Sequence, residues 1–451
     1  MRAADPYRAR RRPALASGMP MKPSLSATRR AVLGTAALAA AAPAAAQPAP
    51  QDPGGEAEAK RILERYDAFG EKASGGPGDD ACGAWIEAEL KALGYATGRQ
   101  TFQAPAYEGE ASLGVGDARA TLIPQAIVVP TPEGGVEGPL YLAGAGKGGP
   151  GIALLVLPYA RWSTALGFVE TRVKAAIAAG ATAVVVITTG PTGEALALNA
   201  PADRPLFDRP VAVMAPRDAE PFLKAAAEGA RGLLRMSGRS FRRPAFNVTA
   251  RLDRGAPSWL VLSTPRSGWF GCTGERGSGL AVWRLLVAWA ARSSLPANLA
   301  LVATSGHEYE YQGGELYIHD LAPKPAETAL WVHIGANVAA RDWHERGTTL
   351  SPLPGADSQR YLLVSPPHVE AARAAFAGLP GLEAVYTADP KVAAGELASI
   401  LQAGYPRAMG IFGSHRYHHA RNDDLRCVSP ALVPPVAQAF QATIEAAFKG
   451  V

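Results

Sequence analysis

The feature that most limits the possible folds is an alternation of short apolar runs and helix-like segments from Phe246 onward. Two of the apolar runs are SWLVLSTP and NLALVATSG, and between them GSGLAVWRLLVAWAARS has apolar residues at helical spacing. Strands that are apolar on both faces and alternate with helices are typical of a sheet that is mostly parallel and covered on both sides. Residues 246–451 are therefore predicted to form an α/β unit.

A chain of 451 residues is long enough for two or three compact units. Before Phe246, two further segments differ from the predicted α/β unit and from each other in their pattern of apolar residues. Residues 47–103 contain EAEAKRILERYDAFG and GDDACGAWIEAELKALGY, which predict two helices joined by a Gly/Pro loop. Residues 104–245 consist of short apolar runs broken by Gly and Pro, with two strand-then-helix repeats. We interpret residues 104–245 as a separate β-rich domain, and its scattered charged residues favour a lid or a binding scaffold.

The net charge of +5 comes from one segment, because residues 1–46 carry eight basic residues and one acidic residue. The rest of the chain has a net charge of about −2, so the charge gives no reason to expect a nucleic acid or an anionic surface as a partner. Residues 25–47 contain paired arginines, then an apolar stretch too short to span a bilayer, then an Ala-x-Ala end. Residues 1–46 are thus predicted to be a twin-arginine signal peptide, which predicts a periplasmic or secreted protein with no membrane segment after cleavage.

Chemically active side chains follow the predicted strands. Ligands of parallel α/β sheets bind beyond the carboxyl ends of the strands, so the residues just after each apolar run are the candidates for a site. They are Pro265, Arg266 and Ser267; Glu275 and Arg276; His307 and Glu308; His333 and Asn337; and His415, His418, His419 and Asp423.

This set, and its order along the chain, resembles the zinc exopeptidases of metallopeptidase family twenty-eight, the leucyl aminopeptidase and aminopeptidase Y type. The resemblance covers nearly the whole chain after the leader, from the N-terminal helix pair to the closing YHHARND. It implies a three-layer α/β/α phosphorylase/hydrolase-like zinc-exopeptidase fold, with residues 104–245 as an inserted protease-associated-like domain.

The resemblance also implies a degenerate metal centre. The family binds two zinc ions, but Pro265 and Ser267 stand where it has a His and an Asp ligand, and neither binds zinc as those residues do. Glu275 stands at the position of the bridging Asp, and His307-Glu308 at that of a Glu-Glu pair. One of the two metal positions is therefore expected to survive, with Glu275, Glu308 and His419 as ligands of a single zinc ion.

The positions of other side chains in the family pattern, or at the predicted rim, indicate further roles. His307 replaces the general base of the family, and a neutral histidine suits that task near pH 7. Two guanidinium groups at the predicted rim, Arg266 and Arg276, are expected to hold a substrate carboxylate. Further candidate ligands or partners of the metal site are His333, Asp423 and His418.

Two functions are compatible with these residues. The first is an exported, peptidase-like metallohydrolase that cleaves peptide or amide bonds with a single-zinc or otherwise altered centre. The alternative is a non-catalytic module that binds a peptide or a protein, since loss of a general base and of one metal removes large contributions to catalysis.

Overall fold

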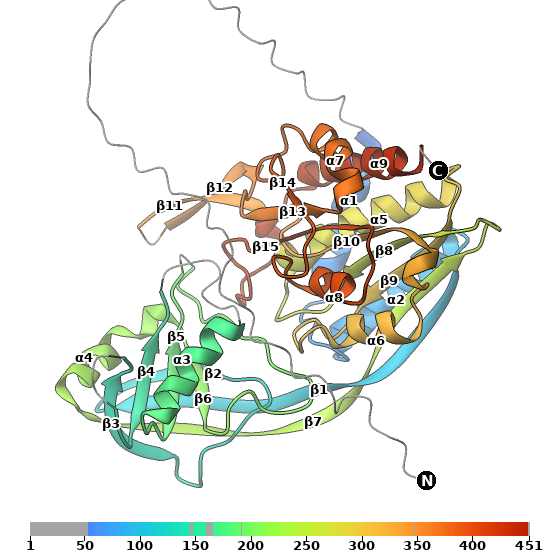
Figure 1. The fold of residues 1–451 in the computed structure, drawn as a ribbon. Helices are drawn as coiled ribbons and strands as arrows, with labels where there is room; N and C mark the ends of the chain where they lie inside the picture. The colour runs from blue at the N-terminus through green and yellow to red at the C-terminus, as the bar shows by residue number, and fades with distance from the viewer. Residues whose placement is uncertain (1–52, 145–147, 159–165, 191, 348, 450–451) are drawn as a thin grey trace, which may run out of the picture.

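The computed structural model divides the chain into an α/β body and a smaller β-rich body (Figure 1). It describes residues 53–144, 148–158, 166–190, 192–347 and 349–449. The predicted signal peptide, residues 1–46, lies outside the described residues. The expected N-terminal helix pair is present as α1 (Pro53–Asp67) and α2 (Pro77–Ala92).

The α/β body contains a mixed sheet with the strand order β1-β7-β9-β8-β10-β15-β13-β14. Strands β9, β8, β10 and β15 are parallel neighbours, whereas β7 and β13 pair with this group in antiparallel fashion. Their bounds are β1 (Ala96–Val115), β7 (Arg231–Leu252), β8 (Trp259–Pro265), β9 (Asn298–Thr304), β10 (Thr328–Ile334), β13 (Arg360–Val364), β14 (Val385–Thr387) and β15 (Ala408–Gly413). The predicted parallel arrangement is confirmed in the centre of the sheet.

Helices cover both faces of this sheet, which gives the expected three layers. One face packs against α1, α2, α5 (Ser278–Arg292), α7 (Val369–Ala375) and α9 (Val433–Phe448), and the other against α6 (Gln312–Asp320) and α8 (Glu396–Gln402). Successive strand residues point to opposite faces: in β8, Leu260 and Leu262 join the first core and Val261 the second. Both faces are buried, so the central strands are apolar throughout.

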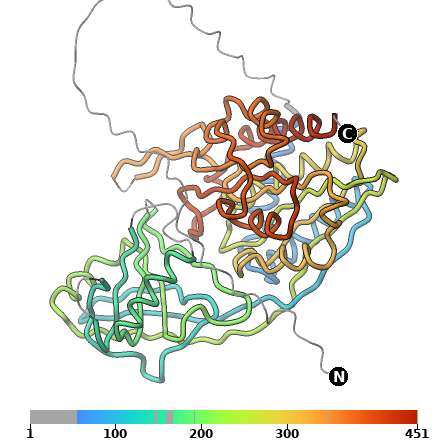
Figure 2. The backbone as a smooth tube through the Cα atoms, in the orientation of Figure 1, coloured from blue at the N-terminus to red at the C-terminus, as the bar shows by residue number. Residues whose placement is uncertain are grey.

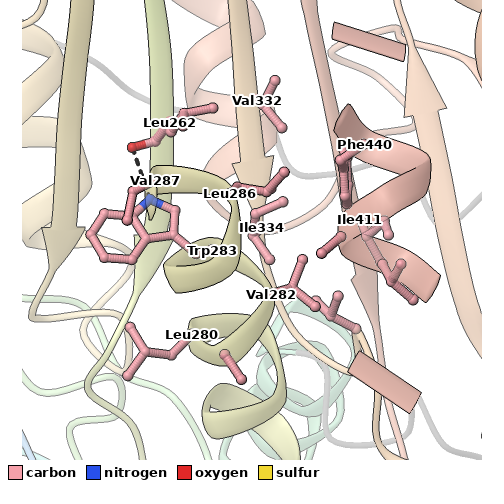
Figure 3. Packing of buried hydrophobic residues seen from close by; sticks show 14 of the residues in the cluster. Leu262, Leu280, Val282, Trp283, Leu286, Val287, Val332, Ile334, Ile411 and Phe440 are labelled. Carbon is pink, nitrogen blue, oxygen red and sulfur yellow. Dashed lines mark hydrogen bonds between the residues drawn. The ribbon is translucent and has the colours of Figure 1, made fainter. Parts of the chain in front are cut away.

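Helix α5 forms the centre of the larger core (Figure 3). Its fully buried Trp283 packs against the sheet, and the indole Nε1 donates a hydrogen bond of 3.1 Å to the carbonyl oxygen of Leu262. A buried indole N–H needs such a partner, because an unpaired one costs about 1–3 kcal/mol. This contact fixes α5, and with it the turn that precedes α5, against strand β8.

The smaller body is a ring of strands in the order β1-β2-β6-β5-β4-β3-β7, closed by the pairing of β1 with β7. Its other elements are β2 (Ala118–Pro124), β3 (Val136–Leu142), β4 (Ile152–Val156), α3 (Leu166–Ala178), β5 (Ala183–Ile187), β6 (Val211–Met214) and α4 (Glu220–Glu228). The long strands β1 and β7 run through both bodies (Figures 1 and 2). The predicted insert boundaries, 104 and 245, fall within these two strands.

A two-stranded sheet, β11 (Arg341–Arg346) with β12 (Thr349–Ala356), extends from the α/β body. None of the helices in the described part of the chain has the length and the apolar character needed to cross a membrane.

Candidate metal and catalytic site

Glu275 lies in a single π-helical turn, Thr273–Gly277, that leads from strand β8 into α5. The turn is held from outside by Asp423, whose Oδ1 accepts a hydrogen bond of 2.7 Å from the amide of Gly274 and whose Oδ2 accepts one of 3.0 Å from the amide of Glu275. Single π-turns often occur at functional sites. The carboxyl group of Glu275 is thereby directed into the interior, where the residue is 1% exposed.

Two adjacent histidines face Glu275 from the loop after β15. The Oε1 atom of Glu275 lies 3.5 Å from Nε2 of His419 and 3.9 Å from Nδ1 of His418. The two imidazole rings stack at 4.1 Å between centroids. His419 has a φ of +60°, an uncommon backbone conformation for a residue with a side chain, of a kind that clusters at functional sites.

The hydrogen bonding of His419 fixes which of its nitrogens is free. Its Nδ1 lies 2.9 Å from the carbonyl oxygen of Ala197, and a carbonyl can only accept, so Nδ1 carries a proton. Nε2 of the neutral ring is then a lone-pair donor that faces the Glu275 carboxylate. Metal-bound histidines are commonly held by such a hydrogen bond from the other ring nitrogen.

Glu275, His418 and His419 form a group whose ligand atoms lie within 4.8 Å of one another. Two imidazoles and a carboxylate are a known ligand set of catalytic zinc. Burial lowers the pKa of His418 well below its usual value, and the neighbouring His419 adds to this, so the ring is neutral near pH 7 and able to bind a metal. Oε2 of Glu275 and Nδ1 of His418 are buried without a hydrogen-bond partner. This donor set therefore fits one zinc ion.

Glu308, predicted as the third ligand, is not in this group. Its Oε1 accepts hydrogen bonds from the amide and the hydroxyl of Ser74, at 2.6 and 2.7 Å, and its Oε2 accepts one of 2.9 Å from the hydroxyl of Ser267. Burial raises the pKa of Glu308, although the Ser74 amide opposes this shift. With both oxygens occupied, Glu308 ties the loop between α1 and α2 to the end of β9, and His418 stands beside Glu275 and His419 instead.

Arg266, expected to bind substrate, is fully buried. Its Nε lies 3.0 Å from Oδ1 of Asp79, while its Nη1 and Nη2 donate to the carbonyl oxygens of Ala303 and Phe246 at 2.9 and 2.7 Å. The guanidinium group is engaged on all sides, so it joins α2 to the sheet and does not reach a substrate.

Arg276, the second predicted guanidinium, is buried beside the metal-binding group. Its Nη2 lies 2.5 Å from Oε1 of Glu275, and its Nε and Nη1 have no hydrogen-bond partner. Burial alone would raise the pKa of Glu275, but Arg276 and the two histidines hold that pKa well below its usual value. The free N–H groups of Arg276 are therefore available to an anionic or carbonyl oxygen in the site.

His307 lies at the end of β9 with its side chain 11% exposed. Its Nδ1 is 3.8 Å from Oε1 of Glu396, and its ring contacts Tyr311 at 4.9 Å between centroids. Burial, followed by the charge of Arg276, lowers the pKa of His307 well below its usual value. The ring is thus neutral near pH 7, as the predicted role requires, but the lowered pKa makes it a weaker base than an ordinary histidine.

His333 lies at the end of β10 on the other side of Glu396. Its Nε2 is 3.7 Å from Oε2 of Glu396, and its Nδ1 is 3.0 Å from the hydroxyl oxygen of Ser263. Burial lowers the pKa of His333 to about 4, although the Glu396 charge opposes this shift. His333 is therefore a neighbour of the predicted base, and it is not part of the group around Glu275.

Asp423 belongs to a second buried group, with His415 and Cys427. Nε2 of His415 lies 3.2 Å from Oδ2 of Asp423. A Cβ atom built on Gly274 would lie 2.5 Å from Cε1 of His415 and 2.7 Å from Oδ1 of Asp423, so the group packs closely around the π-turn. Asp423 acts on the site by holding the Glu275 turn.

A segment of the smaller body, Leu196–Ala200, closes over this site. The amide of Ala197 donates a hydrogen bond of 3.0 Å to the carbonyl oxygen of His419, and the amide of Ala200 donates one of 3.1 Å to that of Glu308. The indole Nε1 of Trp269 donates to Oδ1 of Asn199 at 2.8 Å. The smaller body thus supplies the carbonyl that orients His419 and limits access to the site.

A groove of about 1090 Å³ lies between the two bodies next to this segment. Its wall in the α/β body includes Trp269, Phe270, Tyr309 and Arg421, and its opposite wall comes from β1, β2 and β7. Trp269 and Tyr309 also pack against Ala197 and Ala200, so this wall of the groove borders the closing segment, although none of Glu275, His307, His418 and His419 lines the groove.

Comparison with solved structures identifies the fold of the molecule. BSAP, a zinc aminopeptidase from Bacillus subtilis, superposes with a TM-score of 0.67 at 16% identity over 87% of this chain and 95% of that one. An aminopeptidase from Aneurinibacillus sp. strain AM-1 gives 0.63 at 16% identity over 87% and 93%. A peptidase M28 precursor from Shewanella amazonensis gives 0.61 at 15% identity over 87% and 96%.

The chain therefore has the α/β zinc-exopeptidase fold, in the form found in M28-type aminopeptidases. The expected resemblance to metallopeptidase family twenty-eight is confirmed for the fold. No family model matches the sequence, and no curated protein matches it either.

Three functional neighbours were missed by the sequence analysis: Glu396, Ser74 and the segment Leu196–Ala200. Glu396 follows Gly395 at the start of a short helix, where an acidic residue is ordinary and gives no signal. In the structure, a Cβ on Gly314 would lie 3.2 Å from Cδ of Glu396, but the glycine by itself does not point to Glu396 in the sequence. Only the packing of α6 against α8 brings those two positions together.

Proposed function

We propose that this protein is a zinc-dependent hydrolase of peptide or amide bonds, with a single zinc ion held by Glu275, His418 and His419. The observation that carries the proposal is the facing pair of His419 Nε2 and Glu275 Oε1 at 3.5 Å. Because Ala197 holds the proton of the neutral ring on Nδ1, two electron-pair donors face each other, and a cation between them would bind both, beside the Arg276 guanidinium that already pairs with Glu275. That cation is a metal ion or a second proton on His419.

When bound, zinc in such a site supplies a Lewis acid and lowers the pKa of water. His307 then takes the proton of the attacking water on a ring nitrogen, which is worth roughly 10²–10⁴ in rate. Arg276 donates its unpartnered N–H groups to the oxygen on which negative charge develops. The chain thus supplies the ligands, a base and an oxyanion donor within one buried site.

The groove between the two bodies supports a peptide as the substrate. Its aromatic wall, with Trp269, Phe270 and Tyr309, offers apolar surface and packs against the segment that covers the site. We propose that the protein works in the periplasm or outside the cell after export by the twin-arginine route, on the basis of the leader alone.

Metal analysis of the full chain tests the proposal. We expect about one zinc per chain in the wild-type protein, and loss of that zinc in Glu275→Ala and His419→Ala. Glu308→Ala should keep the zinc, because Glu308 is bonded to Ser74 and Ser267. A wild-type protein that takes up no zinc from zinc-containing buffer, or a Glu275→Ala protein that retains it, would contradict the proposed centre.

A second candidate function is a non-catalytic peptide- or protein-binding module on the same scaffold. The observation in its favour is that Arg276 already pairs with Glu275, while the site is closed by Leu196–Ala200. In this function the cation between His419 and Glu275 is a proton. The two candidates differ in the zinc measurement, since the binding module would be metal-free in its native state.

A further inference from the structure

We propose that Glu396 is a positioning residue that holds the proton of His307 on Nδ1 and so leaves Nε2 as the basic nitrogen. The inference rests on the proposed function, in which His307 is the general base. It concerns a carboxylate far from His307 in the sequence and fully buried in the fold, where Glu396 is 3% exposed. Three polar side chains approach it: His307, His333 and Thr304.

The proton on His333 can be assigned from a chain of donors that starts at Trp331. The indole of Trp331 can only donate, and its Nε1 lies 2.8 Å from the hydroxyl oxygen of Ser263, which therefore accepts. The Ser263 hydroxyl keeps its one proton for Nδ1 of His333, 3.0 Å away, and the Glu396 carboxylate on the other side of the ring, which can only accept, favours this direction. His333 is neutral near pH 7 because burial lowers its pKa to about 4, so its proton is on Nε2, which faces Glu396.

Each oxygen of Glu396 therefore faces a donor other than His307. Oε2 faces the Nε2 proton of His333 at 3.7 Å, and Oε1 accepts a hydrogen bond of 2.9 Å from the Thr304 hydroxyl. Burial raises the pKa of Glu396 above its usual value, and His333 and Thr304 offset only part of that rise. These donors favour the charged carboxylate, with Oε1 as the atom nearest to His307.

Nδ1 of His307 lies 3.8 Å from this oxygen and has no other hydrogen-bond partner. A carboxylate can only accept, so it favours the tautomer with the proton on Nδ1. The distance is longer than a formed hydrogen bond, and catalytic hydrogen bonds are often long without substrate and shorten in the working complex. The arrangement then matches the carboxylate–histidine pair of serine proteases, in which the carboxylate sets the tautomer and does not itself take the proton.

Direct observation of the tautomer tests this inference without any activity. Histidine labelled with ¹⁵N in the full chain distinguishes the two tautomers by the ¹⁵N shifts, and the His307 signals are those lost in His307→Gln. We expect the Nδ1-protonated form in the wild-type protein and a shift toward the Nε2-protonated form in Glu396→Gln. An Nε2-protonated His307 in the wild type would overturn the proposal, even if Glu396→Gln failed to fold.

Kinetics give a second measurement. In Glu396→Gln we expect kcat for peptide hydrolysis to fall by about 10²–10⁴-fold with KM little changed, because the basic nitrogen no longer faces the substrate. Glu370→Gln, whose side chain is 83% exposed, is the matched control and should keep full activity. A folded Glu396→Gln protein with unchanged kcat would refute the role. If the wild type itself is inactive, the proposed function fails, while the tautomer spectra still decide the role of Glu396.

Discussion

Replacement of Arg266 by methionine separates a structural role from the substrate-binding role that the sequence had indicated. In the structure the Arg266 guanidinium is paired with Asp79, and both side chains are 0% exposed. Oδ1 of Asp79 accepts no hydrogen bond and has only the ion pair with Arg266, so Arg266→Met leaves a buried carboxylate oxygen without a partner. Methionine has a similar length but no charge, so the variant removes the ion pair and also the hydrogen bonds to the carbonyl oxygens of Ala303 and Phe246.

Arg266→Met should lower the free energy of unfolding by a large amount for a single substitution. Removing one partner of a buried ion pair costs about 3–5 kcal/mol, because the remaining charge is left uncompensated. At roughly 2–4 °C per kcal/mol for a large domain, the melting temperature should fall by at least about 6 °C. Thermal unfolding followed by circular dichroism measures this change.

Two control variants test whether the loss of stability comes from the buried ion pair. Arg239→Met breaks a pair in which the Arg239 side chain is 72% exposed, so it should cost no more than about 1 kcal/mol. The double variant Arg266→Met/Asp79→Asn removes both buried charges and should recover part of the loss. A melting temperature within about 2 °C of the wild type for Arg266→Met, together with a raised KM, would refute our reasoning and return Arg266 to the substrate site.

The remaining predictions concern pH and export. His333 has a folded-state pKa of about 4, below the ordinary 6.5, so the unfolded chain binds the extra proton first and stability falls as pH drops from about 6.5 to 4. The loss should be about 3 kcal/mol in urea titrations at several pH values, and His333→Asn should flatten this dependence; an equal slope in the variant would contradict the assignment. For the leader, replacement of both Arg29 and Arg30 by Lys should keep the protein in the cytoplasm, as judged by cell fractionation, and unchanged export would argue against the twin-arginine route.

The sequence by itself determined the α/β body. Leu260, Val261 and Leu262 are apolar on both faces of β8, and the helical spacing of α5 follows directly, so local patterns are enough to predict a buried parallel sheet covered by helices. The order of side chains at the strand ends also led to Glu275, His307 and His419 as members of one site. The structure places Glu275 and His419 in contact, and the Glu275 charge opposes the lowering of the His307 pKa that burial and Arg276 cause.

Only the tertiary structure decided which partner each polar side chain has. Glu308 could not be separated from the metal ligands by sequence, because Ser74, which occupies its carboxylate, is 234 residues away along the chain. Likewise, Glu396 approaches His307 only because α8 packs over the end of the sheet, and Ala197 orients His419 across the boundary between two bodies. Backbone patterns are short-range and repeat every few residues, whereas hydrogen bonds and ion pairs depend on distances of a few ångströms that folding alone sets.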